Sequence, residues 1–359
     1  MNNQNDYNDN KKVTYHEQTD ISNILKLREV LKTLPPFCRD YFRAMDPVTT
    51  TNTRISYAYD IRIFFQFLLD ENPAFKNYSL KDFTVDVLDQ LKAVDIEEYL
   101  EYLKVYKNGD KTETNGERGM KRKLSALRSF YAYYFKHEFI KTNPTVLVDV
   151  PKIHDKSIIR LDSDEVALLL DHIEHCGDEL TGQKRAYYEK TKERDLAIVT
   201  LLLGTGIRVS ECVGLDVEDI DFKNNGIKIT RKGGNEMVVY FGPEVERALR
   251  QYLEVREGVI PVTGHEHALF YSTQRKRIGI QAVENLVKKY ARAITTTKKI
   301  TPHKLRSTYG TALYQETGDI YLVADVLGHR DVNTTKKHYA AMDDARRRKA
   351  ASAVHLRED

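Results

Sequence analysis

The stretch "KERDLAIVTLLLGTGIRVSECVGL", residues 192–215, predicts a strongly apolar helix followed at once by a second helix. We expect the first helix to end at the Gly204-Thr205-Gly206 break, because glycine often terminates helices. Upstream, "DSDEVALLLDHI" (162–173) predicts another helix, which Asp162 or Ser163 can cap. Helices therefore dominate this part of the chain.

Short strand candidates follow this helical stretch at 219–222, 226–232 and 236–241. The sequence Gly233-Gly234-Asn235 separates the last two strands and predicts a hairpin turn. Everything after Pro243 returns to a helical pattern. The second half is thus predicted to be mainly α with a small antiparallel sheet.

The first half of the chain reads as entirely helical. Helices are predicted within 20–37, stopping before Pro35, and within 53–71, 95–106 and 119–139. The helix at 53–71 carries an apolar stripe of Tyr57, Ile61, Phe64, Phe65 and Leu68. In the helix at 119–139 we expect an inward face of Leu124, Leu127, Tyr131, Tyr134 and Phe135. The basic residues off that face are Lys121, Lys123 and Arg128.

Composition divides the chain into two domains. Residues 1–20 are rich in Asn and Asp and are predicted to form a disordered tail ahead of a helical domain at 21–150. Pro144 and Pro151 bracket a stretch without helical period, so 151–160 is interpreted as a linker. The second domain covers 161–359, and 359 residues are enough for a core in each.

Charge and cysteine content narrow the class of protein. The net charge is only +3, but the segment from Arg275 to Arg306 holds ten Lys or Arg and a single acid, Glu284, a pattern typical of a nucleic-acid-binding surface. A solvated helix face is the alternative. Cys38, Cys176 and Cys212 lack CxxC spacing, which argues against disulfides and zinc. We expect a cytoplasmic protein, because the chain shows neither a membrane-span pattern nor a signal peptide.

A set of separated polar residues needs a common explanation. Arg208 starts a helix, and Glu211 lies three residues on, within reach of its guanidinium. Taken one at a time, each residue has an ordinary structural interpretation: a surface ion pair, a solvated lysine in a turn, a histidine that caps a helix or a tyrosine that packs in the core. Order and spacing favour a shared site made of Arg208, Lys232, His303, Arg306, His329 and Tyr339.

These segments resemble the tyrosine recombinase (phage integrase) family. "GTGIRVSECVGL" matches its first arginine box, "RKGG" its lysine box, "HKLRSTYGT" its His-x-x-Arg box and "LGHRDVNTTKKHYA" its His-plus-tyrosine box. The resemblance implies a helical core-binding domain and a mixed α/β catalytic domain with a C-terminal exchange helix. The size of the chain brings it nearest to the Xer branch, in particular to the single-recombinase type.

The resemblance also implies chemical roles. Tyr339 is expected to attack a DNA phosphodiester and form a 3′-phosphotyrosyl bond, with Lys232 as general acid. Arg208, Arg306, His303 and His329 would bind the phosphate, and Glu211 would orient Arg208; planar arginine forks suit phosphate oxygens. Tyr309 is the main rival nucleophile. The neighbours that could be confused with site residues are Lys228, Arg231 and Lys304.

The expected partner is double-stranded DNA at specific recombination sites, bound by a homotetramer. A DNA translocase is a further candidate partner. We expect DNA contacts from Lys121, Lys123, Arg128, Lys288 and Lys289. No metal or cofactor is expected, because the arginines and Lys232 supply the positive charge. Chromosome dimer resolution is the expected role; a mobile-element integrase, a topoisomerase of related chemistry and a catalytically inactive DNA-binding protein are the alternatives.

Overall fold

The structure is a computed structural model that describes residues 14–150, 152, 154, 159–231, 234–329 and 332. The chain folds into two compact units, Met1–Asp155 and Lys156–Asp359. The division falls inside the stretch 151–160 that the sequence analysis interprets as a linker. Each unit is described on its own.

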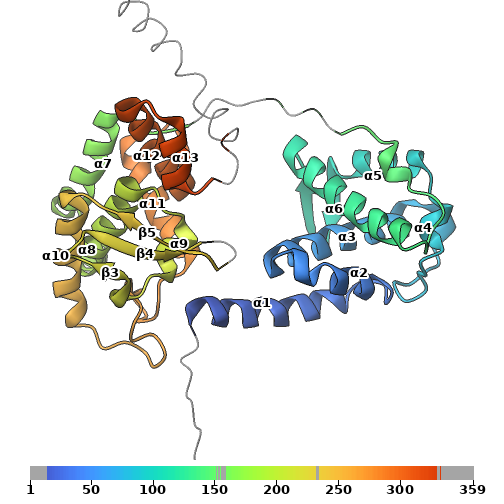
Figure 1. The fold of residues 1–359 in the computed structure, drawn as a ribbon, viewed down its shortest axis with the longest axis horizontal. Helices are drawn as coiled ribbons and strands as arrows, with labels where there is room; N and C mark the ends of the chain where they lie inside the picture. Colours follow the sequence, from blue (N-terminus) through green and yellow to red (C-terminus); the bar gives the residue numbers. More distant parts are fainter. Residues whose placement is uncertain are drawn as a thin grey trace, which may run out of the picture. The chain divides into compact units, whose positions relative to one another are not determined.

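The first unit is a helical bundle with one small hairpin (Figure 1). Its elements are α1 (Tyr15–Leu31), α2 (Cys38–Ala44), η1 (Asp46–Val48), α3 (Thr51–Glu71), η2 (Pro73–Phe75), α4 (Val87–Gln90), α5 (Ala93–Tyr102), β1 (Val105–Asn108), β2 (Lys111–Thr114), α6 (Glu117–Lys136) and η3 (Pro144–Val146).

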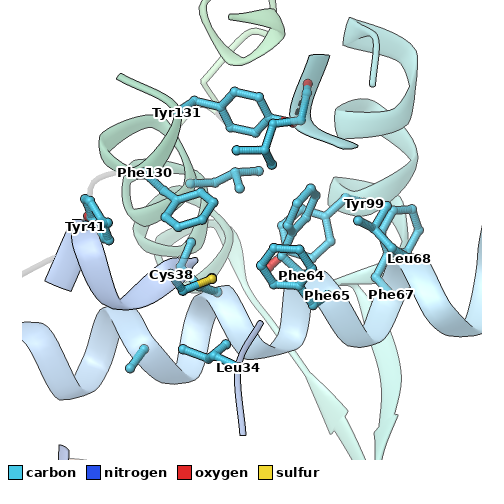
Figure 2. Packing of buried hydrophobic residues seen from close by; sticks show 14 of the residues in the cluster. Leu34, Cys38, Tyr41, Phe64, Phe65, Phe67, Leu68, Tyr99, Phe130 and Tyr131 are labelled. Atoms are coloured by element: carbon cyan, nitrogen blue, oxygen red, sulfur yellow. Dashed lines mark hydrogen bonds between the residues drawn. The ribbon is translucent and has the colours of Figure 1, made fainter. Parts of the chain in front are cut away.

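Aromatic side chains fill the core of this unit. Phe64 and Phe65 of α3 and Phe130 and Tyr131 of α6 are fully buried and lie close together in Figure 2. The ring of Phe65 meets that of Phe130 edge to face, with centroids 6.2 Å apart. Edge-to-face contacts of this kind add to the hydrophobic gain from burial, so the α3–α6 contact anchors the bundle.

The predicted stripe on α3 is present, but other details of this half were wrong. α1 begins at Tyr15, where Thr14 and Glu17 form a capping box, so the tail predicted for 1–20 extends too far. The predicted helix at 95–106 ends at Tyr102, and a β1–β2 hairpin follows. Phe135, expected to face inward, is 48% exposed.

Lys123 is also misplaced by the sequence analysis, because it is buried rather than off the apolar face. Its side chain is 6% exposed, and its Nζ lies 3.6 Å from Asp60 Oδ1 and 3.1 Å from Asn115 Oδ1. Arg122 pairs with the other oxygen of Asp60. Burial raises the pKa of Asp60 and lowers that of Lys123. We call Asp60, Arg122 and Lys123 the Asp60 cluster.

The second unit combines helices with a small sheet (Figure 1). Its elements are α7 (Ser163–His175), η4 (Cys176–Glu179), α8 (Gly182–Thr205), α9 (Val209–Gly214), η5 (Val217–Asp219), β3 (Ile220–Asp221), β4 (Gly226–Thr230), β5 (Glu236–Tyr240), α10 (Pro243–Glu257), α11 (Ile280–Ile294), α12 (Pro302–Thr317) and α13 (Ile320–Leu327).

Helix α8 forms the centre of this unit. Its C-terminal half, Leu196–Leu202, is buried, and α7, α10 and α12 pack on it. A helix that is apolar on all sides belongs in a core, as the opening stretch of sequence suggests. The predicted sheet is antiparallel in the order β3-β4-β5, with Thr230 paired to Glu236 next to the turn. The helix ending and the sheet together position the polar residues described next.

Two further observations bear on the sequence predictions. The helical pattern expected throughout the region after Pro243 is interrupted between Glu257 and Ile280 by turns and the isolated bridge Tyr271–Arg277. Within the described part of the chain, no helix is both long and apolar enough to cross a membrane.

Candidate functional site

The Gly204-Thr205-Gly206 break brings three helices together. Gly206 ends α8 with a left-handed backbone, φ +63°, as expected for a glycine terminator. A Cβ at this position would lie 2.4 Å from Tyr309 Cδ1 on α12 and 3.0 Å from Leu327 Cδ2 on α13. Only glycine permits this approach, so the break fixes the end of α8 against α12 and α13.

Arg208 begins the next helix two residues later and holds the carboxylate predicted for it. Its backbone N–H donates to Glu211 Oε2, and its Nη1 donates to Glu211 Oε1, both at 2.7 Å. Glu211 is 5% exposed, whereas the Arg208 side chain is 38% exposed. A buried carboxylate thus fixes one edge of the guanidinium while other parts of the side chain reach solvent.

Arg306 lies in the second turn of α12 and is buried, with 6% exposure. Its Nη1 donates to the carbonyl of Gly206 at 2.5 Å, and its Nη2 donates to the carbonyl of Leu327. His303, one turn earlier on the same helix, is exposed. The two residues of the predicted His-x-x-Arg box therefore differ in depth, with the arginine buried and the histidine at the surface.

Arg231 is a third arginine at this place, and the sequence analysis did not select it. It follows the last residue of β4, and its Nη2 donates to the carbonyl of Val326 at 2.7 Å. Its Nη1 lies 3.5 Å from the carbonyl of Asp325. Burial lowers the pKa of Arg231, as does the positive charge of Arg208, while Glu211 opposes that shift. We call Arg208, Arg231 and Arg306 the arginine cluster.

The C-terminal end of α13 is the common target of this cluster. Gly328 terminates the helix with φ +62°, a left-handed backbone that glycine adopts without strain. Arg208 Nη2 lies 3.4 Å from the Gly328 carbonyl, so guanidinium groups face the carbonyls of 325–328 in turn. His329 follows directly and donates its backbone N–H to Ala324 at 2.9 Å.

This arrangement is suited to bind an anion. Guanidinium groups carry permanent charge and fixed forks of donors, which match the oxygens of a phosphate. In the cluster, most donors described here point at neutral carbonyls rather than at carboxylates. An anionic oxygen is a stronger acceptor than a carbonyl, so an incoming phosphate can compete for the donors of Arg208 and Arg306.

Two of the predicted site residues, Lys232 and Tyr339, lie outside the described residues. The rival tyrosine, Tyr309, packs against the apolar cluster of Tyr314, Val323 and Leu327. Burial raises the pKa of Tyr309, which makes its phenolate harder to form. The surroundings of Tyr309 therefore favour a packing role.

The predicted DNA contacts differ in their surroundings. Lys121 on α6 is exposed, but Arg128 donates to the carbonyls of Thr145 and Val148. On α11, Lys288 and Lys289 are both exposed, and Lys289 Nζ lies 4.1 Å from the centre of the Tyr290 ring. Lys288 also lines a hollow of about 590 Å³ whose other cationic lining residues are Arg292, Lys298 and Lys299.

Comparison with known proteins gives a consistent family assignment. The profile of the phage integrase family matches residues 160–346. The chain is 32% identical to tyrosine recombinase XerS of Lactococcus lactis subsp. cremoris, over 88% of this chain and 93% of that protein. It is also 32% identical to tyrosine recombinase XerC of Caldanaerobacter subterraneus subsp. tengcongensis, over 93% of this chain and 91% of that protein.

Solved structures share the fold at lower identity. The XerH recombinase bound to its difH substrate matches with a TM-score of 0.60 and 23% identity, over 84% of this chain and 79% of that one. The Tn1549 transposon integrase in complex with circular intermediate DNA matches with a TM-score of 0.60 and 22% identity, over 84% and 94%. These likenesses support the mainly α, two-domain fold class.

Proposed function

We propose that in this chain, which belongs to the phage integrase family and is a tyrosine-type site-specific DNA recombinase, Arg208 and Arg306 of the arginine cluster clamp the phosphate at the strand-transfer site. The observation that supports this most strongly is the convergence of Arg208 and Arg306 on one helix end, beside His329. Two guanidinium groups from different helices reach a common point, as clamping a single phosphate requires.

In the proposed reaction, Arg208 and Arg306 hold the non-bridging oxygens of the scissile phosphate. Charge develops on these oxygens as the phosphorus gains a fifth ligand, and preorganised donors at that position lower the barrier. His303 and His329 add donors to the same phosphate. Glu211 holds Arg208 in place through the two 2.7 Å contacts and keeps its fork oriented before DNA arrives.

The covalent step conserves the energy of the phosphodiester. The Tyr339 oxygen forms a bond to phosphorus and releases its proton to solvent, while the bond from phosphorus to the 5′ oxygen breaks. Lys232 gives a proton to that departing oxygen, which leaves as a hydroxyl. Because the phosphotyrosyl ester retains the bond energy, a 5′ hydroxyl from a second duplex can reverse the step and join the strands.

The partner in this proposal is double-stranded DNA. The exposed cations Lys288, Lys289 and Lys121 supply backbone contacts, since most protein–DNA contacts position the protein rather than read sequence. Exchange of strands between two sites uses four protomers. The expected C-terminal exchange helix, which lies outside the described residues, would dock on a neighbouring protomer and close the ring. A DNA translocase is the proposed accessory partner. The proposed role of the recombinase is resolution of chromosome dimers, supported by the identity to XerS over most of both chains.

A covalent-trapping assay tests the proposal. A duplex with a nick close to the scissile phosphate loses a short fragment after cleavage, which prevents religation and accumulates the protein–DNA adduct. Tyr339→Phe should abolish the adduct and leave DNA affinity within about threefold, because a single hydroxyl contributes little to phosphate binding. Tyr309→Phe is the matched control and should still form it. An adduct with Tyr339→Phe, or its loss with Tyr309→Phe, would refute the assignment.

A further inference from the structure

Arg231 joins two parts of the second unit that are far apart in sequence. Its backbone closes the base of the β4–β5 turn, because its N–H donates to Asn235 at 2.8 Å and its carbonyl accepts from the N–H of Gly234 at 3.0 Å. Its side chain donates to the carbonyl of Val326 at the end of α13. One residue therefore fixes the start of the turn and ties it to that helix end.

The end of α13 is shaped to receive this side chain. A Cβ on Gly328 would lie 1.5 Å from Arg231 Nη1 and 2.1 Å from its Cζ, so the guanidinium fills the place where any other residue would put its side chain. The last carbonyls of a helix lack partners within the helix and carry partial negative charge, which favours a cation there. Glycine at 328 thus serves both the helix ending and the contact with Arg231.

The contact is specific to arginine. The fork presents Nη1 and Nη2 to the successive carbonyls of Asp325 and Val326, whereas a lysine ammonium is a single point charge on a flexible chain. The Nε of Arg231 is buried and has no hydrogen-bond partner. The side chain thus gives up one solvated donor to make this contact, which indicates a role for the geometry of the link.

We propose that Arg231 is a positioning residue for the strand-transfer site, because it fixes the base of the β4–β5 turn, from which the chain continues to Lys232, against the end of α13. The same helix end leads to His329, and Arg208 binds beside it, so the link joins the segment that carries the proposed general acid to the phosphate clamp. The inference rests on the proposed role of Lys232 as general acid. Arg231 acts through Lys232 and makes no contact with the reacting atoms.

A substrate with sulfur in place of the scissile 5′ bridging oxygen tests the proposal. In the ordinary substrate the departing oxygen takes a proton from Lys232 as the bond from phosphorus to the Tyr339 oxygen forms. In the sulfur substrate the bond from phosphorus to sulfur breaks and the thiolate leaves unprotonated. A thiol has a pKa of about 8.5 against about 15.7 for water, so sulfur departure needs no acid. Any defect that operates through Lys232 should disappear with this substrate.

The expected results separate Arg231 from the phosphate clamp. General acid catalysis contributes about 100- to 10,000-fold, so Arg231→Ala should slow cleavage of the oxygen substrate by roughly 10- to 100-fold. With sulfur its rate should return to within about threefold of the unmodified protein. Arg231→Lys should give the same result as Arg231→Ala, slow on oxygen and rescued by sulfur, because one lysine ammonium cannot bind both carbonyls. Arg208→Ala should be slow on both substrates, and Lys228→Ala, on the exposed face of β4, normal on both.

The ratio of the two rates does not depend on the folded fraction, so an unstable variant is still informative. Equal slowing of Arg231→Ala on both substrates, or no slowing on either, would overturn the proposal. Lys232→Ala should also be rescued by sulfur; if it is not, the acid role of Lys232 is wrong. The double variant Arg231→Ala/Lys232→Ala, measured on the oxygen substrate, provides a second test. A rate equal to that of Lys232→Ala supports positioning through Lys232, and a slower rate excludes such positioning.

Discussion

The Asp60 cluster and the arginine cluster both gather cations inside a folded unit, but their partners differ. In the Asp60 cluster, Lys123 and Arg122 face a buried carboxylate. In the arginine cluster, Arg208 keeps one donor on the buried Glu211, but its Nη2 and both donors of Arg306 face backbone carbonyls at helix ends. Removing the cations from Asp60 would leave a buried charge uncompensated, whereas a carbonyl that loses its donor remains neutral.

The difference shows which cations are available to a ligand. Exchange of a carbonyl for a phosphate oxygen replaces a neutral acceptor with an anionic one and is favourable, because hydrogen bonds to charged groups are roughly twice as strong. Exchange at the Asp60 cluster would cost the buried ion pair. The identity of the acceptor, rather than the number of lysines and arginines, therefore distinguishes the proposed phosphate site from a structural cluster.

The largest expected effect is a fall in the DNA cleavage rate of the variant Arg208→Ala. Loss of one preorganised donor to a developing oxyanion typically costs about 100- to 1,000-fold in rate, so the cleavage rate should fall by that factor. The matched variant Arg122→Ala removes an arginine from the Asp60 cluster and should change the rate by less than about threefold per folded molecule. Single-turnover cleavage with saturating protein measures both. Similar losses in the two variants would remove the distinction between the clusters.

The free energy of unfolding tests the structural role of the Asp60 cluster. Lys123→Ala leaves Asp60 with a single cationic partner and should lower the free energy of unfolding by about 1–3 kcal/mol. Lys121→Ala, two residues away and exposed, should change it by less than about 0.5 kcal/mol. Urea denaturation of the two variants checks this. If Lys123→Ala is as stable as Lys121→Ala, the buried pair contributes nothing.

The smallest expected effect concerns salt. Neutralising Lys288 and Lys289 together should reduce the slope of log K against log salt by about two, since each phosphate contact contributes about 0.9. Lys298→Ala is the control: Lys298 is bonded to Asp162 and Glu165, at 3.1 and 2.5 Å, so its loss should leave the slope unchanged. Binding to specific and random duplexes over a salt series measures the slopes. Weakening confined to the specific duplex would contradict a backbone role.

Much of the fold follows from sequence because it depends on local signals. The Gly204-Thr205-Gly206 break and the β3–β5 strands were predicted, and the contact of Arg208 with Glu211 is present. The β1–β2 hairpin was missed although Asn108-Gly109 is a turn signal and Gly109 has φ +61°. The helix predicted at 95–106 was extended past Tyr102, where α5 ends, and so covered the start of β1.

The burial of Lys123 and the contacts of Arg231 could not be predicted from local sequence signals. Whether Lys123 is buried depends on Asp60, 63 positions earlier on another helix, and no local pattern records that pairing. Arg231 was passed over because the family boxes draw attention to its neighbour Lys232. Its role depends on α13, nearly a hundred residues later in the chain. Contacts at such separations are tertiary, so helical periodicity cannot reveal them.

The most direct test of the central claim removes the charge from the phosphate itself. A methylphosphonate at the scissile position replaces one anionic oxygen with a methyl group, so an arginine that neutralises this charge contributes less to stabilising the transition state. If Arg208 and Arg306 bind the phosphate, the penalty of Arg208→Ala should shrink at least about tenfold on this substrate, while Arg122→Ala shows the same small penalty on both. An equal penalty for Arg208→Ala on the two substrates would contradict the account.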